Sequence, residues 1–397
     1  MNSKLITIRQ NDRIISAICE GNEMVQVSVD SAEEDSILGN IYLGKVKNII
    51  KNINAAFVEI AEGSMCYLSL DDMVSPIYVK NKKTDRTAAG DELLVQISKE
   101  DIKTKAPVAT VNLNFTGKYV VLIHGKSMIG VSSKIEDEAE RNRLKRMLQN
   151  AKGDSYGFLV RTNAMYKPEA LIREEMEFLL REYRDILEYG IHKTPFSLLY
   201  RTPPGYICNI RDGFADSIDE ILTDDAGIYE KIRSYLENCQ KEDLPKLQLY
   251  QDKLIDLDKL YSISHKLQNA LREKVWLKSG GTIIIQPTEA LTVIDVNTGK
   301  AVNGKKKVQE TFLKVNMEAA VEIAKQLRLR NISGIIIIDF IDMTEESYKE
   351  LLIKELDRLF RQDPIKTTLI DMTALNLVEV TRKKVRKPLY ELVSQST

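Results

Sequence analysis

The chain has 397 residues, of which 43% are hydrophobic and 29% are charged. This composition excludes a globally disordered chain and a disulfide scaffold, and at about 150 residues per domain the length allows two or three domains. The 57 Lys and Arg residues nearly balance the 58 Asp and Glu residues, for a net charge of −1. Any contact with nucleic acid must therefore come from local basic patches.

The four cysteines form neither a metal-binding nor a disulfide pattern. Cys19, Cys66, Cys208 and Cys239 include no Cys-x-x-Cys pair, and the three histidines cluster with none of them. We therefore expect free thiols, no structural zinc and a reducing compartment. The sequence contains no run of about 18 apolar residues and no secretory signal at its start, so we expect a cytoplasmic protein without a membrane span.

The first part of the chain is predicted to be rich in β-strands. Alternating stretches at 5–8 and 24–29 predict up to three strands, which are too few for a core of their own. We therefore expect residues 1–36 to join a sheet that is completed elsewhere. Between residues 37 and 118, short strands with glycine corners predict a small OB-fold barrel.

The middle of the chain mixes both kinds of element. Within 119–202, strands at 119–123 and 157–160 alternate with a charged helix at 136–149 and a long helix from about 168 to 189. Residues 203–275 also contain strands and helices.

From residue 276 to 397 the pattern is α/β. Apolar residues recur at steps of three and four over 308–329, which predicts an amphipathic helix. A second helix is marked by apolar positions from Tyr348 to Leu359 and ends before Pro364. The expected strands lie at 282–285, 291–296, 335–338 and 367–370.

Two apolar strands of this last region each run into an aspartate. Asp295 ends the first strand and is followed by Asn297, and Asp339 ends the second. A helix of about 20 residues separates the strands, so a crossover is expected to place the two carboxylates side by side. Two carboxylates and an amide oxygen suit Mg²⁺ or Mn²⁺, which indicates phosphodiester hydrolysis. The alternative is that the aspartates only cap the following turns, and Asp342 fits that description best.

Three further features are compatible with RNA. Phe57 and Tyr67 are predicted on the polar face of adjacent strands, where bases can stack, although a packing patch between domains is an equal alternative. Arg161 and Thr162 end a strand and can hold a terminal phosphate, to which Gly130 would add a backbone donor, although most such pairs are ordinary surface residues. The basic positions could contact the phosphate backbone or form solvated helix faces; they are Lys300, Lys305, Lys306, Lys307, Arg328, Arg330 and the run 382–387.

The sequence around the two aspartates resembles the ribonuclease E / ribonuclease G family. The resemblance lies in Ala290 to Gly299, in Ala324 to Asn331 and in Gly334 to Met343. Further matches at 39–42, 160–162, 275–277 and 279–281 extend it over almost the whole chain. The short ribonuclease G type is the closer match.

The resemblance implies an α+β protein with several subdomains. An RNase H-like subdomain (1–36 and 203–275) would be interrupted by the OB-fold barrel (37–118) and a 5′-sensor subdomain (119–202). A DNase I-like catalytic subdomain (276–397) would follow. The family's Cys-Pro-x-Cys zinc link between protomers has no counterpart in these 397 residues, so we expect no structural zinc, and a homodimer is possible.

The resemblance also assigns roles to residues. Asp295 and Asp339 would bind Mg²⁺, and Asn297 would orient the scissile phosphate. Phe57, Tyr67 and Lys105 would grip single-stranded RNA, and Gly130, Arg161 and Thr162 would sense a 5′-monophosphate.

The expected function is Mg²⁺-dependent endonucleolytic cleavage of single-stranded RNA to 5′-phosphate and 3′-hydroxyl ends, in mRNA decay and in the processing of rRNA precursors. Two alternatives stay open at this point. One is a non-catalytic RNA-binding protein, and the other is a DNA nuclease with the same metal chemistry.

Overall fold

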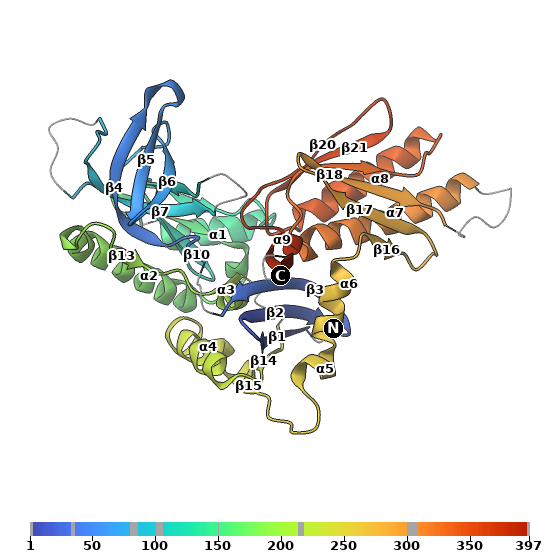
Figure 1. Cartoon of the computed structure of the whole chain (residues 1–397), viewed down its shortest axis with the longest axis horizontal. Coiled ribbons are helices and arrows are strands. Elements are labelled where there is room, and N and C mark those ends of the chain that lie inside the picture. The colour runs from blue at the N-terminus through green and yellow to red at the C-terminus, as the bar shows by residue number, and fades with distance from the viewer. Residues whose placement is uncertain are drawn as a thin grey trace. The chain divides into compact units, whose positions relative to one another are not determined.

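The computed structural model describes residues 3–32, 36–79, 86–100, 106–149, 151–212, 218–299 and 308–394. The chain divides into two compact units (Figure 1). Unit 1 contains Met1–Ala32, Asp219–Lys231 and Pro245–Thr397, and unit 2 contains Glu33–Ile218 and Ile232–Leu244. The chain therefore leaves unit 1 after its first strands and returns to it later.

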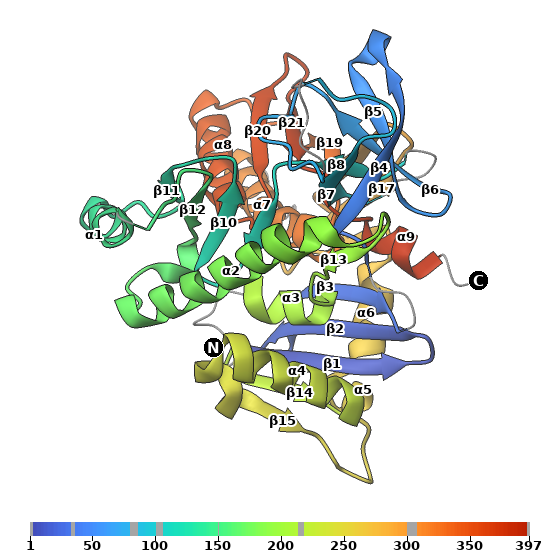
Figure 2. The ribbon, with the colours of Figure 1, turned by 90° about the vertical axis from the view of Figure 1, so that its left-hand side faces the viewer.

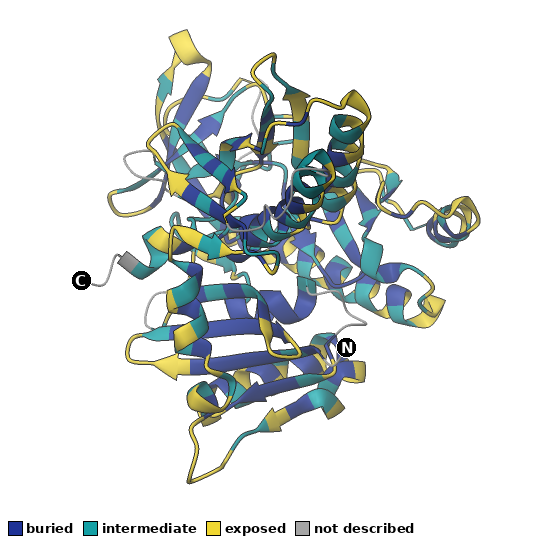
Figure 3. Ribbon diagram, turned by 90° about the vertical axis from the view of Figure 1, so that its right-hand side faces the viewer, coloured by how far each residue is buried: buried dark blue, intermediate teal, exposed yellow. Residues whose placement is uncertain are grey.

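The first sheet of unit 1 has five strands in the order β15-β14-β1-β2-β3. The strands are β1 (Ser3–Gln10), β2 (Arg13–Glu20), β3 (Glu23–Ser31), β14 (Glu220–Thr223) and β15 (Leu247–Leu249). Because β14 pairs in parallel with β1, the N-terminal strands are indeed completed by a segment more than 200 residues later. Most residues of β1 and β2 are buried, as Figure 3 shows. Helices α5 (Leu257–Tyr261), α6 (Ile263–Ala270) and α9 (Leu389–Ser394) contribute to the same core.

The second sheet of unit 1 carries the two aspartates. Its six strands follow the order β16-β17-β18-β19-β21-β20. They are β16 (Lys274–Trp276), β17 (Thr282–Pro287), β18 (Leu291–Asn297), β19 (Gly334–Asp339), β20 (Thr367–Met372) and β21 (Leu377–Arg382). Helices α7 (Val308–Leu329) and α8 (Glu346–Arg361) pack their apolar stripes on one face of this sheet. The predicted helix at 308–329 is confirmed.

Strand β21 was not predicted, although it lies in the interior of the sheet. It pairs with β19 on one side and with β20 on the other. Val378 and Val380 alternate with polar neighbours, and both side chains are fully buried. The strand is only six residues long, which makes its period-two pattern hard to separate from a loop.

Unit 2 contains a closed barrel of five strands, in agreement with the predicted OB-fold-like barrel. The strands are β4 (Ile41–Ile50), β5 (Ala55–Ala61), β6 (Ser64–Ser69), β7 (Glu92–Lys99) and β8 (Val108–Thr110). They pair in the cyclic order β4-β5-β6-β8-β7, and β4 pairs again with β7 to close the barrel. The inward positions of β5 and β6, such as Val58 and Leu68, form the core of the barrel.

The rest of unit 2 is a four-stranded sheet with helices. The sheet order is β11-β12-β10-β9, from β9 (Asn114–Thr116), β10 (Val120–His124), β11 (Ile129–Val131) and β12 (Tyr156–Val160). Helices α1 (Glu138–Leu148) and α2 (Glu169–Tyr189) bury their apolar residues in one core with this sheet (Figure 2). Unit 2 also contains β13 (Leu198–Tyr200), which pairs with β4, α3 (Gly205–Asp212), and the second half of α4 (Ala226–Cys239). Short 3-10 helices lie at Lys51–Ile53, Thr162–Ala164, Gly190–His192 and Lys241–Lys246.

Candidate functional site

Asp295 and Asp339 lie directly opposite each other on neighbouring strands. Strands β18 and β19 run parallel, and their register pairs Asp295 with Asp339. Since neighbouring strands lie about 4.8 Å apart and paired residues project from the same face, the two carboxylates lie side by side. The prediction that a helical crossover brings them together is confirmed.

The two carboxylates project from the face of the sheet that α7 and α8 leave uncovered. Ile294 and Ile338, the neighbours that point the other way, are fully buried against these helices. The strict alternation along both strands therefore leaves Asp295, Asn297 and Asp339 on the open face.

Asn297 is held beside the carboxylate pair. Its amide nitrogen donates a hydrogen bond of 2.6 Å to Asp295 Oδ2. The backbone turns sharply two residues later, where Gly299 has φ of +54° and a Cβ would overlap the Gly280 carbonyl oxygen. Only glycine fits this turn without strain, so Gly299 fixes the end of the strand on which Asn297 lies.

The loop after Asp339 is held by a buried side-chain amide on helix α7. The Asn316 side chain on α7 accepts a hydrogen bond of 3.0 Å from the Ile341 backbone N–H and donates one of 2.8 Å to the Ile341 carbonyl oxygen. Farther along the loop, Asp342 accepts a hydrogen bond of 3.1 Å from Asn376. These bonds fix the backbone at Ile341 and the side chain of Asp342 on the loop that follows Asp339.

The crowding of like charges affects Asp339 directly. Partial burial raises the pKa of the Asp339 carboxyl, and the negative charges of Asp295 and Asp342 raise it further. Repulsion of this kind is relieved when a cation lies between the carboxylates. The electrostatics therefore fit a site for a divalent cation.

The donor set fits Mg²⁺ rather than a fully protein-ligated metal. Within the described residues, no group of three or more His, Cys, Asp or Glu side chains has the geometry to hold a metal ion. Mg²⁺ usually keeps several waters and binds through one or two carboxylates, so Asp295 and Asp339 are sufficient. The predicted basic residues Lys300, Lys305, Lys306 and Lys307 lie outside the described residues.

The two aromatic residues of the barrel also lie together. Phe57 on β5 and Tyr67 on β6 are cross-strand partners, and their rings meet edge to face with centroids 6.3 Å apart. Both are half-buried, whereas their neighbours Ala56, Val58 and Leu68 point into the barrel. The predicted aromatic pair on the outer surface of adjacent strands is therefore present. Lys105 lies outside the described residues.

Arg161 and Thr162 follow β12, but they point to different partners. The Arg161 guanidinium lies 2.8 Å from Asp212 and donates to the Gly117 carbonyl oxygen at 2.5 Å. The Thr162 hydroxyl lies 3.3 Å from that of Ser132, on the loop that follows β11 and Gly130. The two residues predicted to hold a terminal phosphate thus belong to two separate hydrogen-bonding networks.

Asp212 was not singled out in the sequence, yet it accepts two arginines. Arg211 donates to both of its oxygens at 2.9 and 2.8 Å, and Arg161 approaches one of them. Although burial opposes ionisation, these guanidinium groups lower the pKa of Asp212 to about 2. No local motif marks this contact, because 51 positions separate Arg161 from Asp212.

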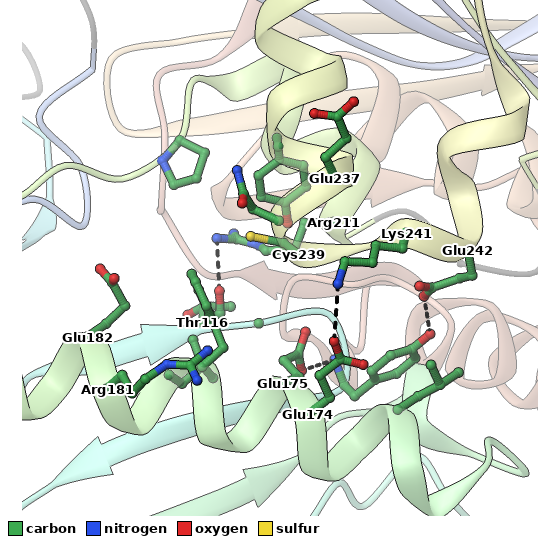
Figure 4. Close-up of a pocket in the computed structure, with 18 of the residues that line it drawn as sticks. Thr116, Glu174, Glu175, Arg181, Glu182, Arg211, Glu237, Cys239, Lys241 and Glu242 are labelled. Atoms are coloured by element: carbon green, nitrogen blue, oxygen red, sulfur yellow. Dashed lines mark hydrogen bonds and ion pairs between the residues drawn. The ribbon is translucent and has the colours of Figure 1, made fainter.

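Unit 2 also contains a cavity of about 540 Å³ beside Arg211 (Figure 4). Most of its charged lining residues are paired within the protein. Lys241 lies 3.6 Å from Glu174, and Glu242 accepts from the Tyr119 hydroxyl at 2.6 Å. Glu175 accepts three backbone N–H groups, from Lys118, Tyr119 and Val120. These contacts indicate a structural role for the cavity walls.

Two of the predicted basic contacts are buried, which corrects the surface role expected for them. Arg330 donates from Nε to Gln326 at 2.6 Å, and burial lowers its pKa to about 10. Arg382 forms a buried ion pair with Asp363. Arg328 is partly exposed in the last turn of α7, and it alone of the three is accessible to a phosphate.

Comparison with known proteins decides the family. The model of the Ribonuclease E/G family matches residues 114–385. Ribonuclease G of Escherichia coli K12 is 33% identical over 384 residues, which cover 94% of this chain and 78% of the relative. The chain belongs to the ribonuclease E/G family. This confirms the resemblance seen in the sequence.

Two other members extend the similarity over nearly the whole chain. Ribonuclease G of Haemophilus influenzae is 32% identical over 97% of this chain and 80% of the relative. Ribonuclease E of Nostoc is 34% identical over 99% of this chain, but over only 57% of its own length. In the described part of our chain, none of the helices is both long and apolar enough to cross a membrane.

Proposed function

We propose that this protein is a Mg²⁺-dependent endoribonuclease that hydrolyses single-stranded RNA to 5′-phosphate and 3′-hydroxyl products. The observation that carries the proposal is the register of β18 and β19, which sets Asp295 and Asp339 side by side on an open sheet face beside Asn297. The names of its relatives support action on RNA. Its cellular tasks would be mRNA decay and the processing of rRNA precursors in the cytoplasm.

The carboxylate pair and Asn297 have distinct tasks in this proposal. Asp295 and Asp339 hold the cation, and the Asn297 amide, already fixed by Asp295, orients the scissile phosphate. A bound Mg²⁺ supplies Lewis-acid stabilisation of the phosphate and an activated water. The negative charge of Asp342 also raises the pKa of the Asp339 carboxyl.

The barrel would hold the RNA strand. Phe57 and Tyr67 present partly exposed rings, and base stacking on such rings contributes about 1–3 kcal/mol per base. Lys105 and Arg328 are proposed to contact phosphates. Arg330 is left out of this set because its side chain is buried.

A 5′-monophosphate is proposed to bind at Gly130, Arg161 and Thr162. A phosphate at this place would compete with Asp212 for the Arg161 guanidinium. The Thr162 hydroxyl would exchange its contact with Ser132 for a phosphate oxygen. The binding of a 5′ end would raise the local concentration of the rest of the strand at the cleavage site.

The subdomain assignment belongs to the same proposal. The first sheet of unit 1 would be the RNase H-like part, its second sheet the DNase I-like catalytic part, and residues 119–202 the 5′-sensor. The alternative function is that of an RNA-binding protein without catalysis. The two differ in whether the carboxylate pair is needed for an activity beyond binding.

The test is to compare the wild type with Asp295→Asn and Asp339→Asn on a short unstructured RNA. Both variants should lose cleavage while they keep RNA affinity within about threefold, because neither removes a base-stacking ring. Glu379→Gln is a matched control. Glu379 on β21 pairs with Ile337, two residues before Asp339 on β19, and therefore lies on the same face of the sheet as Asp339. It should cleave at the wild-type rate.

The result that overturns the proposal is RNA binding by the wild type with no cleavage at any Mg²⁺ concentration. That outcome would favour the RNA-binding alternative. A matched DNA strand should resist cleavage, and its cleavage at an equal rate would indicate a general nuclease. Faster cleavage of 5′-monophosphate than of 5′-hydroxyl RNA, lost in Thr162→Val, would support the sensor.

A further inference from the structure

The edge of the second sheet of unit 1 carries an aromatic residue on the same face as the carboxylate pair. Strand β16 pairs with β17, and β17 pairs with β18. These registers place Trp276, Thr282 and Asn297 in one row across three strands. Lys274, Ile284 and Asp295 form the next row. Trp276 therefore lies two strands, or about 10 Å, from Asn297.

The Trp276 ring is exposed and held in a defined orientation. Its exposed fraction is 67%, although tryptophan is among the most highly buried residue types on average. The Lys274 ammonium lies over the ring, 4.5 Å from its centroid. This cation–π contact orients the indole and occupies one of its faces, which leaves the other for a planar ligand. Val275 between them packs into the core and anchors the strand.

Next to Trp276, the sheet edge forms a basic cavity of about 380 Å³. Its lining includes four cationic side chains, from Lys266, Arg272, Lys274 and Lys325, but only one carboxylate, that of Glu23. Glu23 neutralises Lys325 at 2.7 Å, so a positive excess persists at the cavity. The rest of the lining combines amide groups with apolar side chains, which suits an anionic ligand that also carries planar, partly apolar groups; these residues are Asn22, Asn269, Gln326, Met24, Ala270, Val275 and Leu329.

We propose that Trp276 is a stacking platform for a nucleobase of the substrate strand, next to the nucleotide that is cut, and that Lys274 contacts the adjoining phosphate. The strand would continue from the open sheet face, past Trp276, into the basic cavity. The proposal rests on the proposed function, since it takes single-stranded RNA as the ligand. An aromatic ring beside cations matches the way proteins bind single strands, whereas a protein partner would not need the positive excess.

The protein offers a direct readout, because Trp276 is its only tryptophan. The Asp295→Asn variant of the 397-residue chain is used, so that no cleavage is expected during a titration with unstructured RNA. Base stacking should quench the Trp276 fluorescence in a saturable way. The midpoint should equal the Kd obtained from the anisotropy of a labelled copy of the same RNA.

Substitutions in the same background test the ring itself. Trp276→Ala should raise the Kd of the RNA about tenfold, which is the loss expected for one stacked base, and Trp276→Phe should stay within about threefold of the parent. The association constant for RNA falls as the salt concentration rises, and Lys274→Gln should make the slope of log K against log salt less steep by about 0.7, the value for one phosphate contact. Leu351→Ala, an exposed apolar residue on α8, should change neither quantity.

Unchanged fluorescence at saturating RNA, together with an unaltered Kd in Trp276→Ala, overturns the inference while the proposed function stands. Saturable quenching in a protein whose wild type fails to cleave RNA supports the platform and overturns the proposed function instead. An acidic peptide of the same net charge as the RNA is tested at the same concentration. If the peptide quenches the Trp276 fluorescence and the RNA does not, the cavity is assigned to a protein partner and the inference is overturned.

Discussion

Removal of Asp363 should destabilise unit 1 far more than removal of an exposed carboxylate in the same kind of ion pair. Arg382 and Asp363 have side chains that are only 2% and 4% exposed. Arg382 donates to both Asp363 oxygens at 2.8 and 3.2 Å, and its remaining donors reach the Asn331 side chain and the Ile332 carbonyl oxygen. This network joins the end of β21 to the turns before β19 and β20.

Asp363→Ala leaves the Arg382 guanidinium buried without its counter-charge. Breaking a buried pair from one side costs about 3–5 kcal/mol, most of it the penalty for the uncompensated charge. Asp357→Ala is the matched control, because Asp357 pairs with Arg361 at the same 2.8 Å but the side chains are 50% and 70% exposed. An exposed pair of this spacing contributes about 0.3–0.5 kcal/mol.

The assay is urea unfolding followed by far-ultraviolet circular dichroism, because the single tryptophan, Trp276, is already 67% exposed in the folded protein. The midpoint should fall strongly in Asp363→Ala and barely in Asp357→Ala, with unchanged slopes. Equal small shifts in both variants would refute the reasoning, since they would show that burial of the pair does not matter.

Three other predictions concern unit 2. Phe57→Ala should weaken binding of unstructured RNA about tenfold in an anisotropy titration, while Phe57→Tyr keeps the ring and stays within about threefold. Acid should destabilise the Asp212 network: the native pKa of about 2 lies below the ordinary value of 3.8, so the stabilisation is complete above about pH 4 and is lost as the pH falls toward 2. After allowance for solvent screening of a side chain that is 37% exposed, Asp212→Asn should remove about 1 kcal/mol at pH 7 and flatten this acid limb in unfolding experiments. Gly157→Ala should lower stability by about 1–3 kcal/mol in thermal melts, because a Cβ there would overlap the Met128 carbonyl oxygen, and an unchanged melting temperature would contradict this.

The carboxylate pair could be predicted from the sequence because its cause is local. Two apolar runs, each ending in aspartate, and a helix of the right length between them are sufficient to specify neighbouring parallel strands. The same holds for Phe57 and Tyr67, whose side-chain direction follows from the period of two along a strand.

Burial of charged residues could not be predicted in the same way. Arg330 and Arg382 look like surface cations in the sequence, because nothing local identifies the groups that they meet. The partner of Arg382 is Asp363, which lies 19 positions earlier and reaches it only after β20 and β21 have paired. The partner of Arg161 is likewise set by tertiary packing.

Trp276 illustrates a second limit. Strand β16 has three residues, too few to show a period, so the direction of the Trp276 side chain cannot be read from its neighbours. Its place on the open face of the sheet, which also carries Asp295 and Asp339, follows only from two successive strand registers.

The central claim, that Asp295 and Asp339 form a metal-dependent hydrolytic centre for RNA, is tested most directly by the chemistry of the product ends. Wild-type protein is incubated with an unstructured RNA in Mg²⁺ or in EDTA, and the termini of the fragments are identified. We predict internal cuts with 5′-phosphate and 3′-hydroxyl ends in Mg²⁺ and intact RNA in EDTA. Cutting that persists in EDTA and leaves 2′,3′-cyclic phosphate ends would contradict the account, because it would show that the RNA 2′-hydroxyl attacks without a metal.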